Sequence, residues 1–206
     1  MSGAGGPTSP LLPGHPWVAQ IGIVASGAVL LPTSEGIAAL CRQGRGAFVR
    51  VLDELLATHG LSAPARWRLV DAWPDNITAS WIDAVLAQSR PTDADVLGEQ
   101  REGDSAVLSL RVPVDLLLFD VHFPELPVLP GLVQLAWALA LGAMRFRTPT
   151  GCRRVEMLKF QRPLRPGAQV QLSLRHDPAL RRLHFGYTHG EVEYSSGRLQ
   201  WEHDDD

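Results

Sequence analysis

A histidine followed by three prolines and a glycine is the stretch of this sequence best suited to do chemistry. His122 precedes Pro124, Pro127 and Pro130, and Gly131 opens an apolar run. An imidazole titrates near neutral pH, so His122 is a candidate general base. Prolines stiffen the chain, and a glycine at the start of a helix lets a ligand approach the N–H groups at the positive end of the dipole. That end can hold a thioester carbonyl or another oxyanion. On spacing alone, a hydrogen-bonded histidine in a proline-shaped corner remains the alternative.

The elements around this stretch indicate an antiparallel sheet and one long helix. Residues 131–146 are apolar on all sides of a helix, which predicts that this helix is buried on most of its surface. Alternating apolar and polar residues predict strands at 107–112, 170–174, 183–187 and 198–201. Turn residues at 166–167, 177–178 and 189–190 separate them. We therefore expect an α+β fold whose second half is a curled antiparallel sheet around a central apolar helix.

The first half of the chain predicts a smaller α+β unit. Residues 18–31 favour one or two strands, and apolar residues at helical spacing follow from Ser34, a candidate N-cap, to a stop at Gly60. A strand at 67–70 and a helix at 82–86 complete the unit. We expect a flexible N-terminus at 1–10, a subdomain at 11–88, a polar linker at 89–95, a second domain at 96–202 and an acidic tail at 203–206.

Composition limits the classes of function. The chain has 206 residues, is 45% hydrophobic and carries a formal charge of −3, so no general attraction to nucleic acid or to an anionic membrane is expected. The most apolar run, 132–141, is shorter than the roughly 20 residues of a membrane span. The start lacks a basic region before its apolar residues, so no secretory signal is expected. Cys41 and Cys152 lie far apart without metal-like spacing, which fits a cytoplasmic protein without a metal site.

The second half resembles a known family. The string His122-Phe123-Pro124-x-x-Pro127-x-x-Pro130-Gly131 is similar to the signature of the hotdog-fold 3-hydroxyacyl-[acyl-carrier-protein] dehydratases. Residues 133–137, 158–162, 165–167 and 195–198 resemble the ApeI-like branch of that family, which is associated with aryl polyene synthesis. The likeness covers about residues 95–202. Several ordered motifs over that length are more specific than a lone histidine.

The resemblance implies roles for individual residues. The histidine at position 122 would act on the C2 proton of the acyl chain, and the N–H of Gly131 would polarise the thioester carbonyl. Phe123 and Pro130 would contact the substrate. The family needs no cofactor of its own, because the acyl group arrives on the phosphopantetheine of an acyl carrier protein or of CoA. It works as a dimer, in fatty-acid or aryl-polyene-type biosynthesis.

The sequence departs from the family at the second catalytic group. The family has an Asp or Glu on the central helix that assists loss of the 3-hydroxyl, and Ala136 stands there. An alanine exchanges no proton, and Gln134 is turned away by about 200° of helix rotation. Asp120 would share a face with His122 in an extended segment, and Glu125 lies in the following turn, so both are weak candidates to replace the acid.

Three functions remain open at this stage. A dehydratase paralogue paired with this chain would supply the missing acid, whereas a homodimer would lack it at both sites. A non-catalytic subunit that binds acyl chains or carrier protein is the alternative, and a hotdog thioesterase is a third. Lys159, Arg162 and Arg165 would meet an acidic carrier protein or its phosphopantetheine, or would form an ordinary solvated strand edge.

Residues 11–86 resemble the small C-terminal subdomain of adenylate-forming acyl or aryl ligases. The likeness rests on His15-Pro16-Trp17, residues 66–71 and Pro74-x-Asn76. The family's Gly-Lys pair is replaced by Ala79 and Ser80, and a serine carries no charge to stabilise an adenylation intermediate. No glycine-rich phosphate loop is present in the sequence either. We expect a degenerate unit that does not adenylate by itself and serves as a fusion vestige or a docking module.

Overall fold

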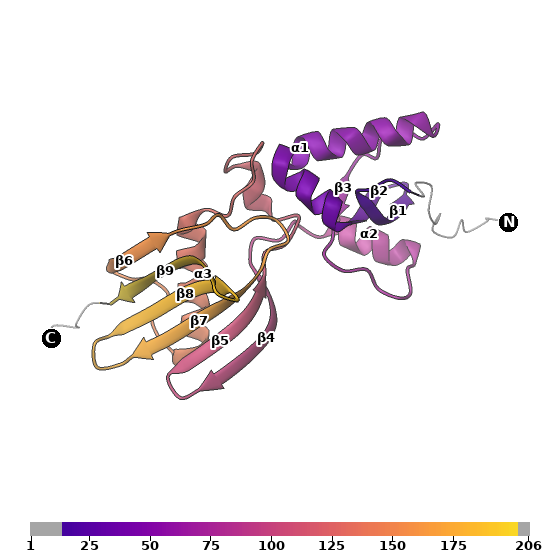
Figure 1. The fold of residues 1–206 in the computed structure, drawn as a ribbon. Coiled ribbons are helices and arrows are strands. Elements are labelled where there is room, and N and C mark those ends of the chain that lie inside the picture. The colour runs from indigo at the N-terminus through magenta and orange to yellow at the C-terminus, as the bar shows by residue number, and fades with distance from the viewer. Residues whose placement is uncertain (1–13, 202–206) are drawn as a thin grey trace. The chain divides into compact units, whose positions relative to one another are not determined.

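The computed structural model describes residues 14–201. Two compact units share the chain, and each contains a segment that is distant in sequence. The N-terminal unit comprises the chain up to Thr92 together with Pro113–Val128. The C-terminal unit comprises Asp93–Val112 and the chain from Leu129 onward. The predicted second domain at 96–202 is therefore interrupted, since the segment that carries His122 folds with the N-terminal unit (Figure 1).

The N-terminal unit is a three-stranded sheet with two helices. Strands β1 (Val18–Val24) and β2 (Gly27–Pro32) form an antiparallel hairpin, and β3 (Trp67–Leu69) adds parallel to β2. Helices α1 (Ser34–Thr58) and α2 (Ala79–Ala87) pack on this sheet. Their apolar faces build two clusters of buried side chains, one with α1 and one with α2. The strands and helices predicted for this half are thereby confirmed.

Helix α1 begins one residue earlier than its sequence suggested and is kinked. The N-cap is Thr33, not Ser34, because the Thr33 hydroxyl accepts a hydrogen bond from the Gly36 N–H at 3.0 Å. Gly44 interrupts the helix with φ +75° and ψ 169°, a conformation that residues with a side chain rarely adopt. The kink lies against the backbone of Pro124, in the loop that carries His122.

The C-terminal unit is one six-stranded antiparallel sheet with the order β4-β5-β7-β8-β9-β6. Helix α3 (Gly131–Phe146) packs against β7 and β8. The strands are β4 (Asp95–Glu102), β5 (Ser105–Arg111), β6 (Arg154–Phe160), β7 (Gln169–Asp177), β8 (Arg182–His189) and β9 (Val192–Gln200). A sheet and a central helix in this arrangement confirm the expected α+β hotdog fold.

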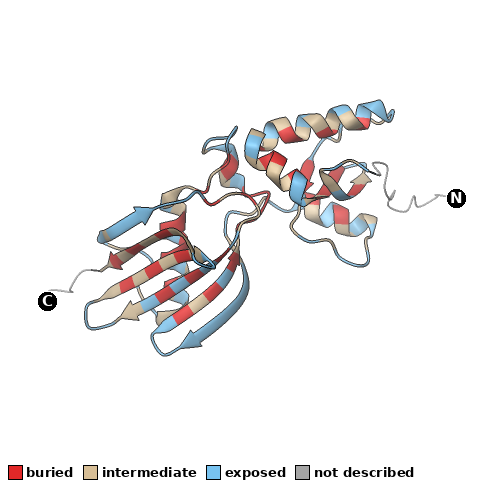
Figure 2. Ribbon diagram, in the orientation of Figure 1, coloured by how far each residue is buried: buried red, intermediate tan, exposed pale blue. Residues whose placement is uncertain are grey.

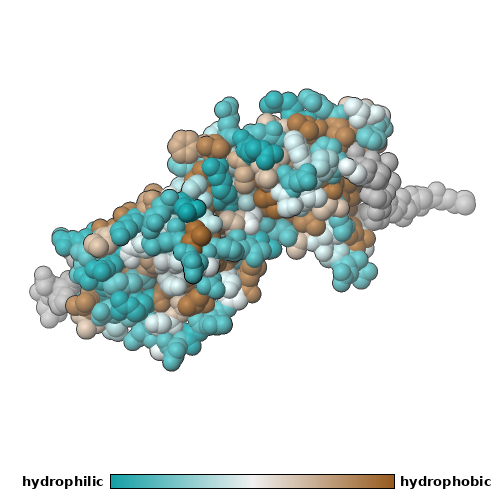
Figure 3. Space-filling model, viewed as in Figure 1, coloured by the Kyte–Doolittle hydropathy of each residue, from teal (hydrophilic) through white to brown (hydrophobic). Residues whose placement is uncertain are grey.

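Buried and more exposed residues alternate along the inner strands of this sheet, and this alternation is absent from its two edge strands. In β5, β7 and β8 every second residue is buried, and Figure 2 shows this as alternating bands. Residues of β4 and β6 are exposed or half-buried on both faces, so these strands carry no period-two signal. That is why the sequence did not predict them as strands. Figure 3 shows mostly hydrophilic side chains on the outer face of the inner strands.

The prediction that α3 is buried on most sides is wrong. The exposed fractions of Leu132 and Met144 are 77% and 78%, and Ala136 and Ala140 are exposed as well. These four residues follow an i, i+4 spacing and therefore form one stripe along the helix. The sheet covers the opposite face only, where Leu135, Trp137 and Ala138 are buried. An apolar helix face of this length is consequently left open within the single chain. No helix among residues 14–201 is long and apolar enough to cross a membrane.

A buried polar network anchors α3 to the sheet. Gln134 is 2% exposed, and its side-chain oxygen accepts a 2.6 Å hydrogen bond from the hydroxyl of Ser195 in β9. Its amide nitrogen donates to the Leu129 carbonyl at 3.2 Å, and its backbone carbonyl accepts a 2.8 Å bond from the Tyr187 hydroxyl in β8. Burial raises the pKa of the Tyr187 phenol, which keeps it a donor. The network fixes which face of α3 meets the sheet.

We expect Ser195→Ala to lower the free energy of unfolding by about 1–3 kcal/mol, because the Gln134 side-chain oxygen would be left buried without its donor. Chemical denaturation followed by circular dichroism measures this. The matched control is Ser173→Ala on the exposed face of β7, which should change stability by less than about 0.5 kcal/mol. Equal effects of the two substitutions would contradict the anchoring role.

Candidate active site

His122 lies in the loop between a short 3-10 helix, Leu117–Asp120, and the start of α3. Its side chain is half-buried, and its ring packs edge-on against Phe123 with centroids 4.4 Å apart. Its backbone N–H donates to the Leu118 carbonyl at 3.1 Å. Phe123 itself has φ +51° and is 63% exposed, so the chain reverses sharply directly after the histidine. The loop thus presents the imidazole on a strained turn with an exposed aromatic neighbour.

A buried carboxylate holds the segment that leads to His122. Asp115 is 1% exposed, and its two side-chain oxygens are surrounded by three guanidinium groups. Arg45 of α1 donates to one oxygen at 2.7 Å, and Arg68 of β3 to the other at 3.2 Å. The Arg90 Nε lies 3.1 Å from the first oxygen, Oδ1, and the Leu69 N–H donates to the second oxygen, Oδ2. The N-terminal unit therefore fixes the segment from three separate elements.

The kink of α1 provides a second contact with the loop. At Gly44 an added Cβ would stand 1.7 Å from the carbonyl oxygen of Pro124 and 3.0 Å from the Cα of Glu125. Glycine is required here on two grounds, the positive φ and the close approach of a neighbouring backbone. The turn that follows His122 therefore sits directly against the backbone of α1. Both contacts belong to the N-terminal unit.

The geometry disfavours the two candidate replacement acids. The prediction that Asp120 shares an extended segment with His122 is wrong, because Asp120 ends a 3-10 helix, in which residues two apart point in different directions. Its carboxylate is bound by the Arg90 guanidinium, with one contact at 3.2 Å and a second, shorter one. Glu125 is exposed, and its backbone lies at the Gly44 kink.

The start of α3 forms a separate group of residues in the C-terminal unit. Pro130 is the N-cap, and its carbonyl accepts from the N–H groups of Val133 and Gln134 at 3.0 and 3.2 Å. An α-helix leaves its first N–H groups without partners inside the helix. The space beside Gly131 is filled, however, since an added Cβ would stand 2.3 Å from the ring of Phe160. The absence of a side chain at 131 thus accommodates Phe160 of β6, whose own ring is 49% exposed.

The structure places Ala136 on the open stripe of α3. It is exposed, while Gln134, two residues earlier, is buried in the polar network. The prediction that these two residues face different ways is confirmed. A side chain at position 136 therefore points away from the core of its own unit. An acid at this position would be presented outward, toward whatever covers the stripe.

The predicted basic residues differ in their surroundings. Lys159 is exposed on β6 and lines a cavity of about 230 Å³ with His184 and Arg198. Arg162 is exposed after β6, and Arg165 is half-buried. The same sheet also carries a cross-strand row, Arg175–His184–Arg198, which was not expected from the sequence. Burial, and then the charges of Arg175 and Arg198, lower the pKa of His184, as a cationic surface should.

No group of three or more His, Cys, Asp or Glu side chains that could hold a metal ion occurs among residues 14–201. Cys41 and Cys152 are both half-buried and form no disulfide.

Comparison with known proteins finds similarity in the second half of the chain. Residues 98–198 match the ApeI-like family, described as ApeI dehydratase. This match is similar in extent to the resemblance to the hotdog 3-hydroxyacyl-[acyl-carrier-protein] dehydratases expected from the sequence. Two curated relatives are the FabZ enzymes of Histophilus somni strains 2336 and 129Pt, named 3-hydroxyacyl-[acyl-carrier-protein] dehydratase. Each is 32% identical over 88 residues, which is 39% of this chain and 58% of the relative. The chain therefore spans somewhat more than half the length of the curated relatives that it matches.

Two solved structures are similar to about half of this chain. The dehydratase heterocomplex ApeI:P from Xenorhabdus doucetiae is 28% identical with a TM-score of 0.48, over 52% of this chain and 96% of that one. An uncharacterised protein from Erwinia carotovora subsp. atroseptica is 29% identical with a TM-score of 0.43, over 52% of this chain and 93% of that one.

Several residues that shape the dehydratase-like motif were not found from the sequence. Asp115 follows Val112-Pro113-Val114 and precedes three leucines, so a charge inside an apolar run was the available signal. Gly44 lies in a helical pattern where an isolated glycine indicates a close packing contact. Phe160 belongs to a motif that was noted for its neighbours Lys159 and Arg162. In each case the partner lies tens of residues away in the chain.

We expect Gly44→Ala to loosen the loop that carries His122, because the new methyl group cannot share space with the Pro124 carbonyl. Hydrogen exchange with mass spectrometry should show faster exchange in the peptide 117–128 and no change in β8. The matched control is Gly46→Ala, where an added Cβ meets nothing within 4 Å. That change should leave exchange unaltered and raise stability by at most about 1 kcal/mol. Slow exchange at 117–128 in both variants would argue against the contact.

Proposed function

We propose that this chain is a dehydratase-type subunit acting on a 3-hydroxyacyl thioester, with His122 as base and the acid supplied by a second subunit. The observation that carries this proposal is the pairing of a retained histidine motif with an outward-facing alanine at the family's acid position. Loss of water from the substrate breaks the C2–H and C3–O bonds and forms a C2–C3 double bond. His122 accepts the C2 proton, and the 3-hydroxyl leaves as water after protonation by the partner's acid.

The electrophilic part of the site is assigned to the amino end of α3. The N–H groups of its first turn, beginning at Gly131, stabilise the negative charge that develops on the thioester oxygen when the C2 proton leaves. Phe123 of the motif and Phe160 of β6 are exposed aromatic side chains, and both are suited to contact the acyl chain. The reaction requires no cofactor in this proposal, because thioester activation resides in the substrate.

Two open apolar surfaces of the C-terminal unit support a subunit partner. One is the α3 stripe of Leu132, Ala136, Ala140 and Met144. The other is the edge strand β6, where Met157 is 61% and Phe160 49% exposed. Soluble proteins cover or blunt such edges. A dehydratase paralogue with an acid on its own central helix would complete the site that contains His122, whereas a second copy of this chain brings Ala136 again.

The N-terminal unit is assigned a supporting role in this proposal. Its resemblance to the ligase C-terminal subdomain suggests descent from a ligase fusion, and Ser80, in place of the family's lysine, engages the Thr78 hydroxyl at 2.9 Å. Asp115 and Gly44 bind the loop that carries His122. We therefore propose that the N-terminal unit positions the loop that carries His122 and does not catalyse adenylation.

We expect His122→Ala to abolish conversion of 3-hydroxyacyl carrier protein to its enoyl product, measured by mass spectrometry with a dehydratase paralogue present. Ala136→Asp should create activity in the chain alone, because both proton-transfer groups would then be present in a homodimer. Native mass spectrometry records the subunit composition alongside. The matched control Ala140→Asp lies one turn further along the same stripe and should create none.

The same experiment separates the alternative functions. Substrate binding without turnover, with and without a paralogue, would contradict the enzyme proposal and favour a non-catalytic acyl-binding or scaffold subunit. Release of a free thiol in place of an enoyl thioester would favour a thioesterase. Activity of Ala140→Asp equal to that of Ala136→Asp would refute the assignment of position 136.

We further propose that the thioester is carried by an acyl carrier protein that docks near Lys159. The FabZ relatives are named for such a substrate, and Lys159 lies with Arg198 and His184 on a cationic part of the sheet. Lys159→Glu should weaken binding of the holo carrier protein about tenfold at low salt, with a smaller loss at high salt. Surface plasmon resonance measures this. Arg50→Glu, an equal charge reversal on exposed α1, should have no effect.

A further inference from the structure

A cavity of the N-terminal unit is lined by four arginines. Its volume is about 560 Å³, and its lining comes from helix α1, strand β3, the end of α2 and the segment after it. All lining residues precede Thr92, so the cavity belongs to the N-terminal unit alone. Three of them come from the motif at residues 66–71 that resembles the ligases. The charged residues of the lining are Arg45, Arg66, Arg68, Arg90 and Asp53.

These arginines have structural partners, and three of them keep donors that the partners do not use. Arg45 donates from Nε to Asp115 and from Nη2 to a backbone carbonyl, and its Nη1 makes no hydrogen bond to the described residues. Arg68 donates from Nε and Nη1, and its Nη2 makes none within the same part of the chain. Neither unbonded nitrogen is shut off from solvent. Arg66 is exposed and uses only Nη1, which donates to a backbone carbonyl at 2.8 Å. Because a guanidinium group has five N–H donors, these side chains retain several for an occupant of the cavity.

The arginines also bring more positive charge than the neighbouring carboxylates neutralise. Arg45, Arg68 and Arg90 all contact the carboxylate of Asp115, and their side chains are 20%, 9% and 13% exposed. Asp120 contacts Arg90 as well, so three largely buried guanidinium groups face two carboxylates. The two remaining charges of the lining, one positive and one negative, cancel. A buried charge without a counter-charge is costly, so this excess favours an anion in the cavity.

The rest of the lining favours an anion that carries an organic group. Val49, Pro64 and Leu86 contribute apolar side chains. Trp67 is held in place because its Nε1 donates to the Asp53 carboxylate at 2.9 Å. The volume lies within the roughly 300–1,000 Å³ of small-molecule sites and is larger than an inorganic ion needs.

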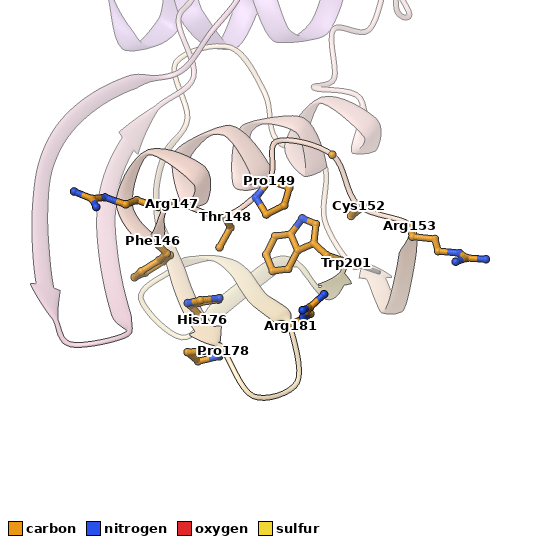
Figure 4. Close-up of a pocket in the computed structure, with 11 residues that line it drawn as sticks. Phe146, Arg147, Thr148, Pro149, Cys152, Arg153, His176, Pro178, Arg181 and Trp201 are labelled. Atoms are coloured by element: carbon orange, nitrogen blue, oxygen red, sulfur yellow. The ribbon is translucent and has the colours of Figure 1, made fainter. Parts of the chain in front are cut away.

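The cavity at the carboxyl end of α3, with a volume of about 610 Å³, is built differently. Figure 4 shows the Trp201 ring between Pro149 and His176. The Nε1 of Trp201 and the hydroxyl of Thr148 make no hydrogen bond, and both atoms are shut off from solvent. They therefore offer no donor to an occupant, and the cavity of the N-terminal unit is the better site for an anion.

We propose that the cavity of the N-terminal unit binds a small organic phosphate, whose oxygens accept hydrogen bonds from the unused N–H groups of Arg45, Arg66 and Arg68. Its organic group packs on Trp67 and Leu86. A phosphate monoester carries about 1.5 to 2 negative charges at pH 7 and three acceptor oxygens, so it suits several guanidinium groups better than a carboxylate does. The site goes beyond the dehydratase proposal, since it uses none of the residues from His122 to Gly131.

The test is isothermal titration calorimetry on the full chain with phenyl phosphate as the probe. We expect a dissociation constant on the order of 1 mM or tighter. Benzoate keeps the ring but carries a single negative charge, and it should bind about tenfold more weakly. Inorganic phosphate, which lacks the ring, should also bind more weakly than phenyl phosphate. Thermal unfolding of each variant checks that it is folded.

Two matched pairs of substitutions locate the binding. Arg66→Gln removes a charge from the lining and should weaken phenyl phosphate binding about tenfold, whereas Arg50→Gln on exposed α1 lies outside the cavity and should leave binding unchanged. Ala65→Glu places a carboxylate in the lining and should weaken binding about tenfold. Ala63→Glu, at an equally exposed position outside the lining, should weaken it less than about threefold because solvent and salt screen the charge.

If Arg66→Gln fails to fold, the pair at positions 65 and 63 decides alone. Absence of phenyl phosphate binding, or equal affinity for benzoate or for inorganic phosphate, would each overturn the proposal. Unchanged affinity in the two cavity variants, or an equal loss in their controls, would overturn it as well.

Discussion

The buried carboxylate of Asp115 is the interaction on which the position of His122 depends. Three guanidinium groups from α1, β3 and the segment before β4 converge on it. A buried ion pair adds little net stability when compared with apolar packing, but removing one member costs about 3–5 kcal/mol because the others are left unpaired. The interaction therefore specifies geometry. It ties the segment from Pro113 onward to the N-terminal unit, and the Gly44 kink then receives the turn after the histidine.

This arrangement makes the position of the motif histidine depend on the N-terminal unit. The motif from His122 to Gly131 is divided between the two units at Val128 and Leu129, so its histidine and its helix belong to different units. The loop that carries His122 would lose its fixed position if the N-terminal unit unfolded. In the function that we propose, the N-terminal unit is therefore a part of the catalytic subunit, although it contributes no group to the chemistry.

The two faces and the two ends of helix α3 have different surroundings. Its buried face is fixed by Gln134, Ser195 and Tyr187, which leaves the stripe containing Ala136 facing outward. The composite site that we propose uses this stripe. Its amino end lies under Phe160, and its carboxyl end opens into the cavity around Trp201. A single apolar helix thus supplies part of the core and, in the function that we propose, a surface for a partner.

The sequence alone determined the elements with a strong period and the identity of the motif. Alternation predicted β5, β7 and β8, and an uninterrupted apolar run predicted α3 from residue 131 to 146, because burial on one face of a strand leaves a mark in the residue types. The alanine at position 136, where the resembled family has an acid, was likewise visible as one letter. The exposed strands β4 and β6 left no such mark.

Only the tertiary structure decided which groups meet. The pairing of Asp120 with Arg90 joins residues 30 positions apart, and the Asp115 cluster spans up to 70. Contacts of this kind depend on the path of the backbone between them, which no local pattern encodes. The same holds for the open stripe of α3: its residues are as apolar as those of the buried face, so hydrophobicity alone cannot separate them, and only the position of the sheet does.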